Sequence, residues 1–381
     1  MMEDTIVNRR GERGVASGVV LVLLVVLSFS VMTLTYLVVS SSRQTTQYLH
    51  KQRAVDLAQA GNQDGLFWFR RQSVLPVTVF APNSMDSEDP SRGIVRTVGI
   101  DELNRVKGVY VVENGLTQDI TGKRGEMGEG WIWKLSSRGI VYRELDSTVA
   151  FDESPNEIIE DVRVTTEIRM LNISPSVEAA VVLDKGRDLT CRSRCVLLGG
   201  NPGSEIAGIC YKRNGYPSVS SGADVRGDPW RKRYSELKLT CRDIFGMDES
   251  SLRNLADYLS EEGADGLPQQ LPDFALIYVQ GDCEFDAAHP LTGGGVLYVD
   301  GDLTLVAGSN SNFVGLIFVT GQIDFCSPSW VEGQVIAVGG GTIGEGDYDK
   351  ANVIYNADVL NLVVQLIGNY RMKRTYSLEV L

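Results

Sequence analysis

The chain has 381 residues and a formal net charge of −13. Phosphate contacts need a basic face, so this charge argues against a general nucleic-acid binder, and no nucleic-acid partner is expected. The 43% hydrophobic and 22% charged residues are ordinary for a globular protein, and the length suffices for two compact domains beyond a membrane anchor.

A long apolar segment lies near the N-terminus. Residues 15–41 carry no charged side chain over 27 positions, whereas about 20 apolar residues cross a bilayer. A cleaved secretory signal would have an apolar core of about 7–15 residues and a small-residue cleavage site, and neither is present. The sequence therefore predicts a single-pass helix in the inner membrane.

The charges around this segment leave its orientation open. Three cations precede it and three follow it, so the positive-inside rule gives a tie: Arg9, Arg10 and Arg13 before, and Arg43, Lys51 and Arg53 after. All six cysteines lie beyond the segment, which favours a C-terminal part outside the cytoplasm.

The helix is expected to continue beyond the bilayer. No proline occurs between Ser42 and Gln72, and Ala54, Leu57 and Ala58 recur at helical spacing. We therefore predict a transmembrane half over residues 15–41 and an extracytoplasmic half over residues 42–75.

The N-terminal region resembles a known family. Arg13-Gly14-Val15-Ala16, the apolar run and KQRAVDLAQAG at residues 51–61 are similar to PilX-type minor pilins and GspK-type pseudopilins. The resemblance implies a leader over residues 1–14 that a prepilin peptidase removes after Gly14, with Val15 as the mature N-terminus. It also implies other pilin subunits as partners, contacted through the N-terminal helix.

The chain departs from major pilins at one position. Major pilins carry glutamate at the fifth mature residue, where this chain has Val19. Such a glutamate neutralises the free amine of a neighbouring subunit inside an apolar filament core, where an unpaired charge is costly. Without it, the subunit suits the tip of a filament better than a repeated position, as in the PilX and GspK types.

Two β regions are expected after the helix. Residues 76–177 alternate short apolar and polar runs, which favours an antiparallel pilin-like sheet with Trp131 and Trp133 as core residues. Residues 178–381 carry a repeat whose marker glycines, Gly281, Gly301 and Gly321, stand 20 residues apart. Such a repeat predicts stacked coils of a short β-solenoid.

The repeat also predicts which side chains face the solenoid core. We expect Ile277, Val279 and Cys283 to point inward in one coil, and Leu297, Val299 and Leu303 in the next. An insertion over residues 211–272 interrupts the repeat, and residues 241–263 are predicted to form one helix capped by Asp248 or Ser250. The fold class is α+β.

The cysteine pattern fits a compartment that permits disulfides. Closeness in sequence makes Cys191 with Cys195 or Cys210 the leading candidates for a bridge, and buried free thiols remain the alternative.

The sequence offers one weak metal site. Glu345, Asp347 and Asp349 alternate like the oxygen ligands of a calcium loop but lack the other positions of an EF-hand, so a solvated acidic loop is the alternative. The family resemblance also supports calcium binding here, because GspK-type heads bind calcium. No other cofactor is expected.

These patterns predict a minor pilin-like structural subunit rather than an enzyme, near the tip of a type IV pilus-like filament, acting in assembly or cell adhesion. It would leave the inner membrane for the filament at the cell surface. One alternative is a membrane-anchored, self-assembling solenoid scaffold of the bactofilin kind. Another is a glycan-active solenoid enzyme that uses aspartates at the glycine turns, including Asp282, Asp300, Asp302 and Asp324.

Overall fold

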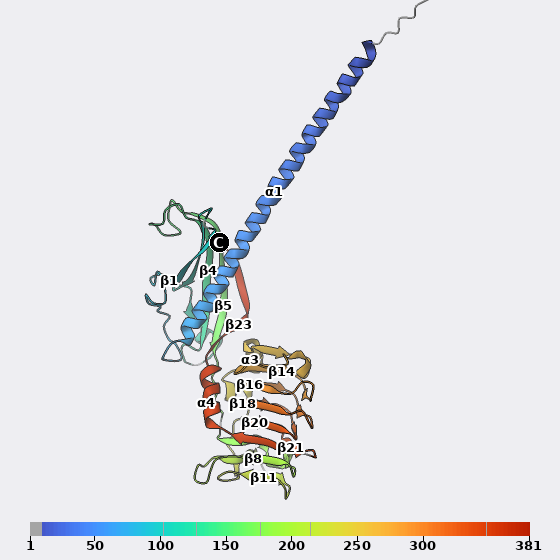
Figure 1. Cartoon of the computed structure of the whole chain (residues 1–381). Coiled ribbons are helices and arrows are strands. Elements are labelled where there is room, and N and C mark those ends of the chain that lie inside the picture. Colours follow the sequence, from blue (N-terminus) through green and yellow to red (C-terminus); the bar gives the residue numbers. More distant parts are fainter. Residues whose placement is uncertain (1–9, 102, 127, 176, 214, 348) are drawn as a thin grey trace, which may run out of the picture.

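The computed structural model describes residues 10–101, 103–126, 128–175, 177–213, 215–347 and 349–381. Figure 1 shows three parts in succession: a long helix, a first sheet wrapped around its end, and a stack of short strands. The α+β prediction is confirmed.

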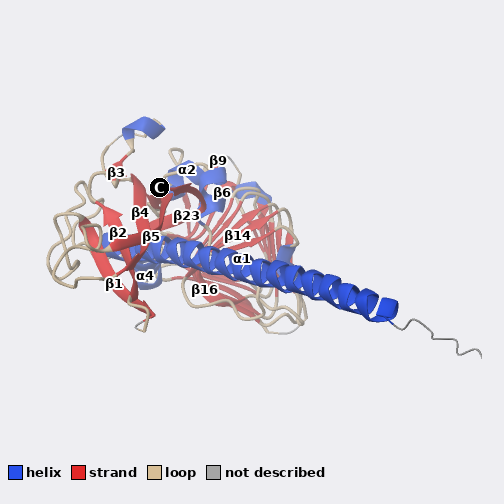
Figure 2. Ribbon diagram, turned by 90° about the horizontal axis from the view of Figure 1, so that it is seen from above, coloured by secondary structure: helices blue, strands red, loops and turns tan. Residues whose placement is uncertain are grey.

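The helix α1 (Arg10–Arg70) is continuous over 61 residues, or about 90 Å at 1.5 Å per residue. Its first half projects from the molecule, and its second half lies along the first sheet (Figures 1 and 2). It ends at Arg70, five residues before the end of the predicted range at residue 75. It begins at Arg10, upstream of the predicted mature N-terminus at Val15.

The first sheet is antiparallel along the order β1-β2-β4-β5-β23, with β3 paired to β4. Trp133 is buried in its core, whereas Trp131 is only half-buried and precedes the strand. The strands are β1 (Gly93–Asp101), β2 (Val106–Glu113), β3 (Gln118–Asp119), β4 (Ile132–Arg143), β5 (Glu157–Met170) and β23 (Tyr370–Val380).

The last strand of the chain belongs to this first sheet. Tyr370 of β23 pairs with Met170, and Val380 pairs with Val162. The predicted boundary, with residues 178–381 all in the solenoid, therefore differs from the structure: the solenoid is inserted between two neighbouring strands of one sheet.

The solenoid has three faces, each a parallel ladder. Three long strands, β16, β18 and β20, run across both of the first two faces. Face 1 contains their first halves together with β22, β8 and β11. Face 2 contains their second halves together with β14, β6, β9 and β12. Face 3 has the order β10-β7-β21-β19-β17-β15. The bounds are β6 (Ala179–Lys185), β7 (Leu189–Cys191), β8 (Cys195–Leu198), β9 (Ala207–Arg213), β10 (Ser218–Val219), β11 (Asp224–Arg226), β12 (Arg231–Arg233), β13 (Tyr258–Ser260), β14 (Ala275–Gln280), β15 (Cys283–Phe285), β16 (Thr292–Asp300), β17 (Leu303–Leu305), β18 (Ser311–Val319), β19 (Ile323–Cys326), β20 (Ser329–Ala337), β21 (Gly341–Glu345) and β22 (Ala351–Tyr355).

Glycines form the corner between faces 1 and 2. Gly295, Gly315 and Gly333 are in register, and all three have positive φ. A β-carbon on any of them would lie within 2.2 Å of a carbonyl oxygen of a neighbouring coil. Only glycine allows coils to stack this closely at such a bend.

The predicted inward residues are confirmed: Ile277, Val279, Cys283, Leu297, Val299 and Leu303 all belong to the interior cluster. The step from β18 to β20 is shorter than the 20-residue repeat, because Ser311 pairs with Ser329, an 18-residue step. Gly339 therefore stacks on Gly321.

The predicted insertion over residues 211–272 is too long. Strands β10, β11 and β12 fall inside it and pair with β7, β8 and β9 as the terminal coil. The single helix expected at residues 241–263 is two helices, α2 (Cys241–Phe245) and α3 (Glu249–Leu255). Gly246, with φ of 71°, ends the first, and Asp248 caps the second by accepting a hydrogen bond from the Ser251 N–H.

Helices cover the outside of face 2. Tyr278, Tyr298 and Phe318 stack at centroid distances of 5.0 Å, and the Phe245 ring meets two of them edge-on. Residues of α2, α3 and α4 (Ala357–Leu366) close this second apolar cluster. Face 2 is thus buried on both sides, as its nearly continuous apolar strands require.

Ion pairs and hydrogen bonds join the solenoid to the first sheet. Arg371 of β23 is almost fully buried and donates to the Asp257 carboxylate at 2.6 Å. Arg169 of β5 donates to the Ser251 hydroxyl at 3.4 Å. Asp257 follows α3 and Ser251 lies in it, and α3 packs on face 2 of the solenoid. These contacts therefore join the solenoid and the first sheet into one head.

Candidate assembly surface

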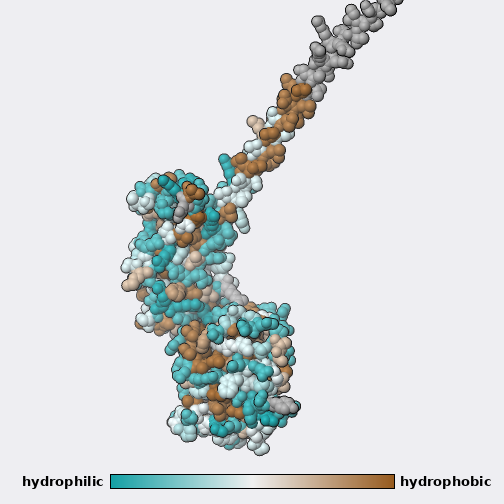
Figure 3. Space-filling view, viewed as in Figure 1, coloured by the Kyte–Doolittle hydropathy of each residue, from teal (hydrophilic) through white to brown (hydrophobic). Residues whose placement is uncertain are grey.

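The first half of α1 exposes an apolar surface. Of the described residues, the helix from Val20 onward is the one element long and apolar enough to cross a membrane. Its large apolar side chains are between 44% and 74% exposed from Val20 to Val39, and Figure 3 shows them as a band beyond the head. A surface of this size is stable only in lipid or against other apolar helices.

Four serine and threonine hydroxyls in this half are paired within the helix. Ser28 donates to the Leu24 carbonyl at 2.8 Å, and Thr33 donates to the Phe29 carbonyl at 2.8 Å. Ser30 and Thr35 make the same i−4 contact. Because each of these four hydroxyl hydrogens is bound to a backbone carbonyl, none of the four is an unpaired donor in lipid.

The second half of α1 is fixed to the sheet by a stripe of small residues. Ala54, Ala58, Gly61 and Gly65 follow one another by four, three and four positions, which places them on one side of the helix. Ala54 and Ala58 are fully buried. A β-carbon on Gly61 would lie 2.0 Å from the Ser137 Oγ of β4, so the helix and the sheet are in the closest contact that their backbones allow.

Aromatic rings hold the end of the helix. Phe69 packs within 5.1 Å of the rings of Trp68, Trp133 and Tyr370. The Tyr370 hydroxyl accepts from the Val77 N–H at 2.7 Å and donates to the Gly130 carbonyl, and burial raises the pKa of Tyr370 to about 12. These contacts fix the end of α1 to the head.

Sequence analysis named Ala54 and Ala58 only as residues at helical spacing, and it did not name Gly61, Gly65 or Gly139. The spacing of Ala54, Ala58, Gly61 and Gly65 by four, three and four positions could have revealed the stripe. A glycine inside a helix lowers the stability of the helix, so two of them on one side indicate close packing. The processing residues Gly14 and Val15 lie in the helical backbone of α1, and their side chains fall outside the described residues.

The structure does not gather the predicted calcium ligands. Glu345 ends β21, and the backbone carbonyl of Asp347 accepts from Arg194 at 2.9 Å. Asp349 lines a cavity on the outside of the solenoid. Across the described part of the chain, no three histidine, cysteine or acidic side chains are placed to hold a metal ion.

The three candidate bridging cysteines are divided between two cores. Cys191 and Cys195 lie inside the solenoid, and the thiol–thiol hydrogen bond between them, together with burial, raises the pKa of Cys195. Cys210 lies in the cluster outside face 2, where burial raises its pKa to about 11. All three are free thiols in this structure, and only Cys191 and Cys195 are neighbours.

The aspartates at the glycine turns have structural contacts. The Asp282 carboxylate accepts from the Asp302 N–H at 2.8 Å, and the Asp302 carboxylate accepts from the Gln322 N–H at 2.7 Å. Each carboxylate thus fixes the turn of the next coil. Burial is the main cause that raises the pKa of Asp324, followed by the nearby Glu345 charge.

No family model matches the chain, and no curated protein matches it. Among solved structures, the chain is similar to the competence-associated pilin ComZ of Thermus thermophilus at 12% identity, over 87% of this chain and 98% of that chain, with a TM-score of 0.22. At that score the two chains do not superpose as a whole, and the match alone does not decide the function.

Proposed function

We propose that the chain is a pilin-like structural subunit that is anchored by α1, with its head outside the cytoplasm. The observation that carries the proposal is the single unbroken helix, half exposed and apolar, half fixed to a folded head. This arrangement lets the same apolar surface lie in lipid before assembly and against other subunits afterwards.

We further propose the PilX or GspK kind, with a place near the filament tip. Support comes from the motif around Gly14 and from Val19, which removes the carboxylate that a repeated subunit would offer to its neighbour. The proposal includes no enzymatic activity, since Asp282 and Asp302 already bind backbone groups of the next coil.

Replacing Gly14 with leucine is expected to block removal of the leader, because the peptidase site would no longer offer a residue without a side chain. Mass spectrometry of the protein from cells that contain the peptidase should give a mature chain beginning at Val15 for the natural sequence and an uncut chain for Gly14→Leu. Equal masses would contradict the processing proposal.

Replacing Val31 with aspartate is expected to reduce the amount of the chain in membranes and in sheared filaments. A carboxylate near the middle of an apolar span costs roughly 3 kcal/mol. The matched control is Gln47→Asp, on the same helix but beyond the apolar half. Immunoblots of the membrane and filament fractions measure the effect, and equal recovery of both variants would argue against the assembly surface.

A further inference from the structure

None of the described helices covers face 1 of the solenoid around Trp330, which is 42% exposed. The outward side chains of this face form a row across six strands, in which each residue pairs in register with the next: Thr292, Asn312, Trp330, Asn352, Val196 and Asp224. We call this set the Trp330 row. Adjacent members stand about 4.8 Å apart, the spacing of paired strands.

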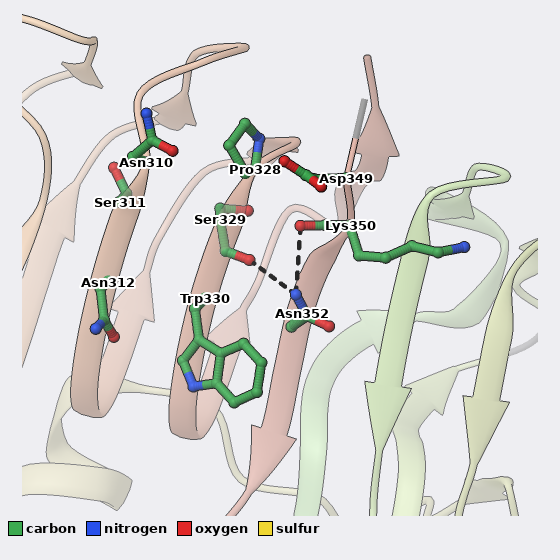
Figure 4. Close-up of a pocket in the computed structure, with 9 residues that line it drawn as sticks. All are labelled: Asn310, Ser311, Asn312, Pro328, Ser329, Trp330, Asp349, Lys350 and Asn352. Carbon is green, nitrogen blue, oxygen red and sulfur yellow. Dashed lines mark hydrogen bonds between the residues drawn. The ribbon is translucent and has the colours of Figure 1, made fainter. Parts of the chain in front are cut away.

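Trp330 is the centre of the row and is exposed. Its side chain is 42% accessible, whereas Trp68 and Trp133 are each 3% accessible. Figure 4 shows its indole ring between the amide side chains of Asn312 and Asn352. An exposed ring flanked by two amides combines an apolar surface for stacking with hydrogen-bonding groups at its edges.

The row borders a cavity of about 530 Å³. The Asn352 Nδ2 donates to the carbonyl oxygens of Ser329 and Lys350, both at 3.3 Å, so the amide plane is fixed and its oxygen remains the group to offer a ligand. Ser329 also lines the cavity, and its buried Oγ has no hydrogen-bond partner among the described residues.

Two charged residues line the cavity, Asp349 and Lys350, and the others are amides, hydroxyls, a proline and Trp330. The Lys350 Nζ donates to the Ser193 carbonyl at 3.4 Å, and Figure 4 shows its side chain directed away from Trp330. The Asp349 carboxylate would repel a polyanion, and one carboxylate is little charge for binding a polycation. The chemistry fits a neutral ligand with apolar faces and hydroxyl edges, which describes a sugar ring.

We propose that face 1 binds an extended neutral oligosaccharide, with one sugar ring stacked on Trp330 and its hydroxyl groups bonded to Asn312 and Asn352. The flat row across six strands favours an extended chain over a coiled one. In the next row of the same face, half-buried Val314 and Ile354 stand on either side of Glu332, whose carboxylate accepts from the Asn356 Nδ2 at 2.6 Å. This inference goes beyond the proposed function and does not depend on it.

Calorimetric titration of the full chain in a detergent without sugar groups tests the proposal. The probes are cellohexaose and chitohexaose, which are extended, and maltohexaose, which is coiled. We expect the two extended probes, or one of them, to bind and maltohexaose to bind at least tenfold more weakly. Trp330→Ala should weaken binding by about tenfold or more, as truncation of an aromatic contact does, and Trp330→Phe should retain part of it.

The matched control is Trp230→Ala, because Trp230 is 38% exposed but lies next to the terminal strand β12 rather than in the row. Its affinity should equal that of the natural chain. Failure of both extended probes to bind, or equal losses in the two tryptophan variants, would overturn the proposal. Failure to bind together with a change in the sedimentation of Trp330→Ala would instead identify face 1 as a protein contact.

Discussion

Replacing Gly139 with valine is expected to detach the second half of α1 from the first sheet. A β-carbon at residue 139 would lie 2.0 Å from the Ala54 carbonyl oxygen and 2.5 Å from the Ala58 nitrogen. Both are backbone atoms of a helix, so no side-chain rotation relieves the overlap. We expect a loss of at least about 3 kcal/mol in the free energy of unfolding of this part of the head.

Urea denaturation of the full chain in detergent, followed by tryptophan fluorescence, measures the loss, because Trp68 and Trp133 lie in the core that the helix closes. Trypsin cleavage after Lys51 or Arg53 should accelerate in parallel. Gly99→Val is the control, since Gly99 is in β1 of the same sheet and a β-carbon there meets no atom within 4 Å. A stable Gly139→Val chain would show that the helix can move away from β4 at little cost.

Replacing Gly315 with alanine is expected to prevent two neighbouring coils of the solenoid from stacking. Gly315 has φ of 149°, and its β-carbon would lie 2.0 Å from the Gly295 carbonyl oxygen in the neighbouring coil. The overlap pushes apart two coils that share one core. We expect a loss of at least about 3 kcal/mol, since stacked coils depend on each interface.

The control variant Gly308→Ala separates the two effects on stability, the steric overlap and the strained backbone conformation. Gly308 also has positive φ, at 81°, but a β-carbon there meets no atom within 4 Å, so the expected loss is only about 1 kcal/mol. Circular dichroism during urea denaturation compares the two variants. Similar midpoints would mean that the left-handed backbone, rather than the contact between coils, determines the stability of these corners.

The parts of the fold that sequence predicts best are those with one dominant period. An uncharged run followed by small residues at helical spacing gives α1, and the 20-residue step gives the stacked coils with Ile277 and Leu297 inside. The second buried layer was missed, although ALIYV, GVLYV and GLIFV are apolar on both sides of each strand. That pattern indicates strands with two covered faces.

The order of the coils could not be predicted, because it depends on pairing between distant segments. One coil takes its face 1 from β22, near residue 353, and its faces 2 and 3 from β6 and β7, near residues 182 and 190. A repeat along the sequence gives no information about pairing between segments so far apart in the chain. The split between α2 and α3 could have been predicted from the sequence. Glycine commonly ends a helix and aspartate commonly caps the start of one, and here Gly246 is followed by Asp248.

Candidate site residues were predicted less well than the fold. Residues near each other in sequence, such as Cys191 and Cys195, are neighbours in space, but Cys210 points to the other side of the sheet. Asp347 and Asp349 follow the end of β21 at Glu345, but this segment does not turn the three carboxylates toward one point, as a ligand set needs. The Trp330 row has no sequence signature, because its members come from six separate strands.

The return of β23 to the first sheet has a mechanical consequence. The chain leaves β5 at Met170 and re-enters β23 at Tyr370, and these two residues are paired in register in the sheet. A tensile load applied to the far end of the solenoid would be divided between two adjoining strands. Extraction of the head would require both to shear, so a subunit held by α1 could withstand traction that a head on one linker would transmit to a single strand.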